Sequence, residues 1–189
     1  MKKLLTLFLV LPLLTTCERD DLCPESSPTT PNMIVDFVDN SILENSKNVF
    51  NLVVLGIEDP SVFPLDTSVP EGSNLRSASG EDTNQVFLPL RTTNDQTYFI
   101  LISDFEIDNN GTPDDLSDDF FIGNQDLVTI DYSRSDVYVS RACGYKTIFV
   151  NTNVTIDQGT DGQWIFQTIP QNDNLTIEDE TITHYTFSH

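Results

Sequence analysis

The chain has 189 residues, of which 38% are hydrophobic and 12 are Phe, and its formal net charge is −21 at pH 7. This acidic excess argues against nucleic-acid binding, which needs a basic footprint, and disfavours electrostatic docking to anionic lipid head groups. The apolar and aromatic content is too high for a disordered acidic tail, so we expect one folded domain with a sizeable core.

The N-terminus has the pattern of a bacterial lipoprotein leader. Two lysines precede an apolar run over residues 4–14, and two threonines then lead to Cys17. Charged, apolar and cleavage regions in this order are typical of a secretory signal, and the apolar run is too short to span a bilayer. The last four residues resemble the bacterial lipobox, although Thr16 stands where Gly, Ala or Ser is usual. We predict residues 1–16 as a signal peptide and Cys17 as the lipidated residue; the alternative is an ordinary cleaved signal followed by an incidental cysteine.

The cysteine count supports the lipoprotein interpretation. If Cys17 carries lipid, Cys23 and Cys143 remain, and an even pair in an oxidising compartment favours a disulfide bond. Such a bond would close a loop of about 120 residues, worth about 4–5 kcal/mol in the loop-entropy model, and would fix the N-terminal segment to the domain. The alternative is two separate thiols.

Residues 17–32 have the composition of a linker. An acidic cluster follows Cys17, and three prolines then occur between residues 24 and 31. We expect an extended, lipidated tether with no core of its own. The acidic cluster is similar to the export tags with which Bacteroidota lipoproteins reach the outer face of the outer membrane; solvated charge in a linker is the alternative.

From residue 33 onward the sequence favours strands. Short apolar runs rich in β-branched and aromatic residues alternate with turn residues, and no window has a convincing period of 3.6 residues. Residues 59–84 are expected to form a long surface loop, and residues 133–136 a tight turn. The expected fold is an all-β, antiparallel β-sandwich, immunoglobulin-like in the loose sense, forming a single domain over residues 33–189. The expected strands cover residues 33–38, 49–55, 85–90, 97–102, 120–122, 128–132, 137–140, 145–150, 154–156, 164–169 and 182–187.

A catalytic site is difficult to assemble from this sequence. The two histidines, His184 and His189, lie in the last six residues, and His184 alternates with apolar residues in the manner of an outward-facing strand residue. We find no nucleophile elbow, no Gly-rich phosphate loop and no zinc-ligand set with usable spacing. Paired carboxylates are too frequent here to indicate a glycosidase. We therefore expect a protein that is not an enzyme and has no catalytic residues.

The acidic loop over residues 104–119 is the sharpest local feature of the sequence. Its oxygen-bearing side chains are spaced two residues apart and are followed by a glycine, a pattern suited to Ca²⁺. The spacing departs from that of an EF-hand at the twelfth position, and we expect no flanking helices, so the nearer likeness is to calcium loops of extracellular repeats. A polar loop with two turns is the alternative. The candidate calcium ligands are Glu106, Asp108, Asn110, Asp114 and Asp118.

Three stretches of the sequence serve as landmarks: CERDDLCP at residues 17–24, DNNGTPDD at residues 108–115 and SRACGYKTIF at residues 140–149. Together they resemble an uncharacterised lipoprotein family of flavobacteria and their relatives, a domain of unknown function. The resemblance implies an outer-membrane lipoprotein and supplies no activity and no catalytic residues. Arg141 and Lys146 lie on either side of Cys143, where they would form either structural ion pairs or a small anion-binding or docking patch.

The sequence therefore predicts a lipid-anchored, non-enzymatic binding or assembly component of the cell envelope, attached to the outer membrane through lipid on Cys17. Other envelope proteins or glycans are the expected partners, and nucleic acid is not. The alternative function is a calcium-stabilised surface adhesion or glycan-binding module. The ligand and the face of the outer membrane are left open.

Overall fold

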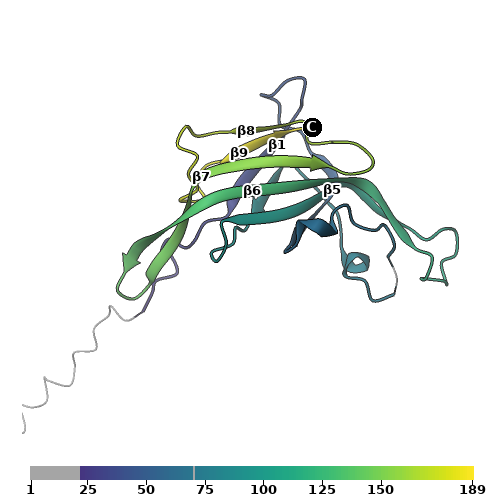
Figure 1. The fold of residues 1–189 in the computed structure, drawn as a ribbon, viewed down its shortest axis with the longest axis horizontal. Helices are drawn as coiled ribbons and strands as arrows, with labels where there is room; N and C mark the ends of the chain where they lie inside the picture. Colours follow the sequence, from purple (N-terminus) through teal and green to yellow (C-terminus); the bar gives the residue numbers. More distant parts are fainter. Residues whose placement is uncertain (1–21, 70) are drawn as a thin grey trace, which may run out of the picture.

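The structure is a computed structural model, and it describes residues 22–69 and 71–189. Its nine described strands form a four-stranded sheet in the order β4-β1-β9-β8 and a five-stranded sheet in the order β3-β2-β5-β6-β7. The two sheets are open and lie one over the other (Figure 1). The predicted all-β sandwich is therefore confirmed.

The strands differ greatly in length. The four-stranded sheet contains β1 (Met33–Val38), β4 (Gln85–Leu88), β8 (Gln167–Pro170) and β9 (Tyr185–Ser188). The five-stranded sheet contains β2 (Val49–Ile57), β3 (Glu81–Thr83), β5 (Gln96–Asp108), β6 (Phe120–Ser140) and β7 (Gly144–Gln158). The strand pairs are antiparallel apart from β1 and β9, which run parallel. That pair brings the first and last strands of the domain side by side.

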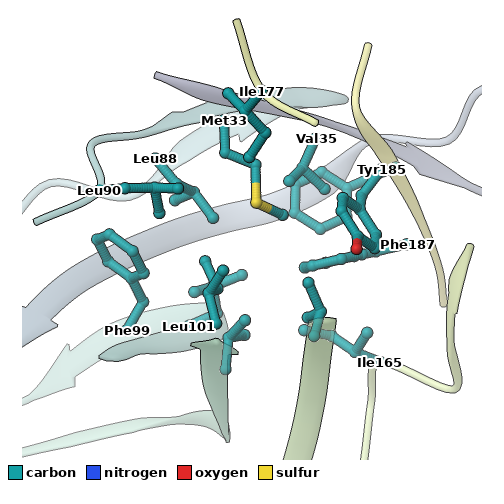
Figure 2. Close-up of a cluster of buried hydrophobic side chains, with 14 of the residues drawn as sticks. Met33, Val35, Leu88, Leu90, Phe99, Leu101, Ile165, Ile177, Tyr185 and Phe187 are labelled. Carbon is teal, nitrogen blue, oxygen red and sulfur yellow. The ribbon is translucent and has the colours of Figure 1, made fainter. Parts of the chain in front are cut away.

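The main hydrophobic core lies between the two sheets. Met33, Val35 and Phe187 of the smaller sheet face Leu101 of β5 and Ile165 across the sandwich (Figure 2). A second buried cluster on the other face of β5 includes Ile100, Ile102 and Phe121. Since β5 is covered on both faces, its sequence is apolar throughout instead of alternating, as is typical of a central strand.

The segment between β2 and β4 covers this second cluster. It contains β3 and two 3₁₀ turns, η3 (Pro60–Val62) and η4 (Asn74–Ser77), within the region expected to be a long surface loop. Arg76 holds it in place, because its Nη1 lies 2.6 Å from Oδ2 of Asp119, whose side chain is only 3% exposed. The same guanidinium donates to the backbone carbonyls of Val69 and Leu116. The segment is therefore a packed cover over the sheet.

The prediction of a tight turn at residues 133–136 is wrong. Those residues continue β6, and each pairs with a residue of β7, from Ser133 with Val150 to Asp136 with Thr147. The sequence there is polar because this part of the hairpin has left the core and is exposed. The chain reverses instead at residues 141–143, and Gly144 follows with a φ of 72°, which glycine adopts at little cost.

Residues 145–150 and 154–156, expected to be separate strands, belong to the single strand β7. A bulge interrupts its pairing with β6 near Asn151, whose φ is 54°. Asn tolerates this left-handed conformation better than most residues, so the strand can bulge here without ending.

The described part of the predicted linker, residues 22–32, is attached to the β6–β7 hairpin. A disulfide bond joins Cys23 to Cys143 at the hairpin turn, 120 residues away in the sequence. Further along, the backbone N–H of Thr147 donates to Oγ1 of Thr30 at 3.0 Å. The pairing predicted from the cysteine count is thus present, and it fixes the N-terminal segment to the end of the hairpin.

We expect the double variant Cys23→Ser/Cys143→Ser to be less stable than the wild type. A cross-link that closes a loop of this length limits the freedom of the unfolded chain, and losing it should lower the free energy of unfolding by about 2–5 kcal/mol. Urea denaturation of the oxidised wild type, the reduced wild type and the double variant measures the change. The reduced wild type should match the variant; equal stability of all three proteins would contradict the prediction.

Candidate functional site

A cleft of about 480 Å³ opens where β2, β5 and β6 meet the segment before β8. Its apolar walls include Phe50 and Phe166, whose side chains are 58% and 54% exposed, and Trp164, which is 8% exposed. A concave site with apolar walls and a few polar groups is the usual form of a ligand site. This cleft is the candidate functional site of the described residues.

The exposed position of Phe50 follows from a bulge in β2. The pairing of β2 with β3 shifts register between Val49 and Leu52, and Asn51 has a φ of 45°. Val49 and Leu52 are buried in the core, whereas Phe50 between them remains exposed at the rim of the cleft. The bulge therefore leaves one aromatic ring free of the core.

A buried carboxylate positions the opposite wall. Oδ2 of Asp126, on β6, accepts hydrogen bonds from the backbone N–H groups of Trp164 at 3.0 Å and Ile165 at 2.8 Å. Burial raises the pKa of the Asp126 carboxyl, and the two N–H donors act in the opposite direction. Sequence reasoning missed this residue, since one Asp among 30 acidic residues carries no local signal of burial.

The last residue of the chain lies against this wall. The His189 ring stands edge-on to Trp164, with centroids 5.8 Å apart, and to Phe37, with centroids 6.0 Å apart. Nζ of Lys47 donates to the His189 carbonyl at 2.8 Å. Burial lowers the pKa of His189, and the contact of its ring with the Lys47 backbone carbonyl acts in the opposite direction. The cleft thus has a neutral imidazole packed beside its indole and a lysine held at its edge.

The cleft also presents side-chain amides. Asn48, Asn124 and Gln163 line it together with the carboxylate of Asp104. Oδ1 of Asn124 is buried and has no hydrogen-bond partner within the described structure. Exposed aromatic rings beside amide groups suit non-covalent binding of a molecule with both apolar and hydroxylated surfaces.

The prediction for His184 is wrong. The residue is not an outward-facing strand residue: it is 1% exposed and lies directly before β9. Its Nδ1 accepts a hydrogen bond at 2.9 Å from the backbone N–H of Ile34 on β1. Burial lowers the pKa of His184, which favours the neutral ring that can accept this bond. The pairing of β1 with β9, which one stretch of sequence does not reveal, places the ring inside.

The structure brings together three of the five predicted calcium ligands. The backbone N–H of Asn110 donates to Oδ1 of Asp108 at 2.8 Å, and its Nδ2 donates to Oδ2 of Asp118 at 3.1 Å. Glu106 is exposed on β5, and Asp114 is exposed in the loop that follows. Within residues 22–69 and 71–189, no group of three or more His, Cys, Asp or Glu side chains could hold a metal ion. Calcium binding by this loop stays a prediction.

The predicted signal peptide, residues 1–16, and the predicted lipidation site Cys17 lie outside the described residues. In the part of the chain that is described, no helix is long and apolar enough to cross a membrane.

A family model described as "Family of unknown function (DUF6452)" matches residues 64–187, which is more than half of the chain. The matched region includes Trp164 and Phe166 of the cleft and the hairpin turn with Cys143, and it begins after Phe50. No curated protein and no solved structure matches the chain.

We expect the stability of the protein to fall as the pH drops below the ordinary histidine pKa of 6.5. Burial lowers the pKa of both His184 and His189, so the unfolded chain binds more protons than the folded chain in this range. The two neutral histidines contribute their full stabilisation above pH 6.5. This stabilisation is lost as the pH falls from 6.5 towards their pKa values in the folded protein. Urea midpoints measured from about pH 7.5 to about pH 5 test this.

The matched variant is His184→Asn, which keeps an acceptor near the position of Nδ1 and does not titrate. Its stability should decline less steeply with falling pH than that of the wild type, and His189 should account for part of the remaining slope. Parallel pH profiles for the two proteins would contradict the role given to His184.

Proposed function

We propose that this chain, which belongs to the DUF6452 family of unknown function, is a lipid-anchored, non-enzymatic binding or assembly component of the bacterial outer membrane. The observation that carries the proposal is the disulfide bond between Cys23 and Cys143. Stable disulfides form in oxidising compartments outside the cytoplasm, which supports export. The bond also attaches Cys23, six residues after Cys17, to the domain.

The leader sequence supports the same location. It combines two lysines, a short apolar run and a lipobox-like ending at Cys17. Lipid on that cysteine would hold the protein to a membrane despite its acidic charge, since each buried CH₂ group contributes about 0.8 kcal/mol. The resemblance to flavobacterial lipoproteins supports the outer membrane, and accessibility to protease on intact cells would distinguish its two faces.

The aromatic cleft supports a binding role. Phe50 and Phe166 are both exposed there, in the cleft that the largely buried Trp164 also lines. Exposed rings beside the amides of Asn48, Asn124 and Gln163 favour a glycan as the second candidate partner class, alongside other envelope proteins. Rings of this kind stack on the apolar face of a sugar while amides bond its hydroxyl groups.

Lipid anchoring is tested by metabolic labelling of the full chain in a bacterial host with a palmitate analogue. We expect the wild type to carry the label and to fractionate with membranes, and Cys17→Ser to lose both properties, because only a thiol at this position forms the thioether to diacylglycerol. Cys143→Ser is the matched control, since it removes a cysteine that should not be lipidated. Undiminished labelling of Cys17→Ser, or no labelling of the wild type, would contradict the anchor.

Glycan binding is tested with an array of bacterial surface polysaccharides and oligosaccharides. We expect Phe50→Ala/Phe166→Ala to weaken binding about tenfold, because losing aromatic contacts costs about 1–1.5 kcal/mol. Phe87→Ala is the matched control, since Phe87 is a similarly exposed phenylalanine (53%) on β4 that does not line the cleft. Equal binding by both variants would remove the cleft from the proposal. Repeating the array with millimolar Ca²⁺ and then with chelator tests the calcium-stabilised alternative.

A further inference from the structure

Two tyrosines face each other near the end of the β6–β7 hairpin. Tyr138 and Tyr145 are register partners, their rings meet edge-to-face with centroids 5.4 Å apart, and the side chains are 57% and 69% exposed. Val137, which points to the other face of the hairpin, is 38% exposed, and Leu22, next to Cys23, is 82% exposed. The end of the hairpin therefore presents an apolar group of side chains, here called the tyrosine tip, whose aromatic members also carry hydroxyl groups.

The tyrosine tip lies outside both hydrophobic clusters. In Figure 1 the paired ends of β6 and β7 extend beyond the smaller sheet, away from the body of the sandwich. Each strand residue from Ser133 to Tyr138 is exposed, and neither tyrosine belongs to a core cluster. Their cross-strand contact stabilises the hairpin, while both rings stay outside the core and open to solvent.

The charge of the tip differs from that of the rest of the chain. Residues 137–146 contain Arg141 and Lys146 and no acidic residue, in a protein with 30 acidic and 9 basic residues. Nζ of Lys146 donates to the carbonyl oxygen of Glu178, which places this cation beside the acidic residues Asp179 and Glu180. The hairpin end itself therefore adds no negative charge towards a membrane surface, and these two carboxylates have Lys146 as a neighbour.

The position of the anchor points to the same end. Cys23 is bonded to Cys143 in the hairpin turn and lies six residues after Cys17. A fully extended chain of that length spans at most about 20 Å. Lipid on Cys17 would therefore keep the hairpin turn within about 20 Å of the bilayer, whatever the orientation of the rest of the domain.

We propose that the tyrosine tip lies in the interfacial region of the bilayer that holds the Cys17 lipid, so that the hairpin is a second membrane contact beside the anchor. Tyrosine is enriched at membrane–water interfaces because its ring enters the apolar boundary while its hydroxyl stays hydrated. The contact relies on the apolar and hydroxyl groups of the two rings and does not need anionic lipid. This contact would fix how the domain stands on the membrane, and it rests on the proposed lipid anchoring.

The test uses the full chain, processed and lipidated in a bacterial host and reconstituted into phosphatidylcholine vesicles that contain brominated lipid. Tyr138→Trp places an indole at the tip, where brominated acyl chains should quench its fluorescence. Ile42→Trp is the matched control. Ile42 is 54% exposed and lies in the loop after Val38, whereas the N-terminal segment enters β1 at its other end, Met33. Trp164 is common to both variants and to the wild type, which gives the background.

We expect added quenching for Tyr138→Trp and no more than the wild-type level for Ile42→Trp. Because the vesicles hold no other protein, quenching at the tip cannot come from a protein partner. If both variants float with the vesicles but Tyr138→Trp is not quenched beyond the wild type, the anchor stands and the tip contact is wrong. Equal added quenching of both variants would also overturn it, since the domain would then have no preferred orientation. If the lipid-processed protein does not float, the proposed anchoring itself fails and the tip contact fails with it.

Discussion

The long antiparallel pairing of β6 with β7 is the constraint on which the other features depend. β6 has 21 residues, far more than the sandwich can cover, so one part of the hairpin lies in the core and the other part leaves it. The covered part carries Asp126, which holds the backbone of Trp164 at the cleft. The uncovered part carries the disulfide-bonded turn at Cys143 and the tyrosine tip. One hairpin therefore connects the candidate ligand site with the candidate membrane contact.

The ends of the domain meet beside this hairpin. β1 and β9 run parallel, and their contact is supplemented by the bond from Ile34 to His184 and by the packing of His189 against Trp164. Because the end of the chain forms part of the cleft wall, the order of the cleft depends on the pairing of strands 150 residues apart in sequence. The disulfide fixes the start of the domain at a different place, the hairpin turn. Both ends are thus tied to structure that the middle of the chain builds.

The sequence allowed the strands, the all-β class and the cysteine pairing to be predicted, because each depends on local composition or on a count. Residues 33–38 matched β1, and the apolar run at residues 97–102 lies within the central strand β5. The prediction of a turn at residues 133–136 was wrong because this part of β6 is exposed. A strand without a buried face can be polar throughout, so the polar residues there did not mark its end. The positions of His184 and Asp126 could not be predicted, since burial there depends on partners more than 30 residues away.

The few basic residues of the folded domain explain how so acidic a chain remains ordered. Arg76 and Arg134 pair with the carboxylates Asp119 and Asp95, and both also donate to backbone carbonyls. Arg91, Lys47 and Lys146 donate to the carbonyl groups of distant segments. The cations are thus used to fasten loops and chain ends, whereas most carboxylates stay in solvent, where their repulsion is screened by salt. An acidic surface fastened in this way is repelled by anionic partners over most of its area. The tyrosine tip carries no acidic residue over residues 137–146, so its own side chains add nothing to that repulsion.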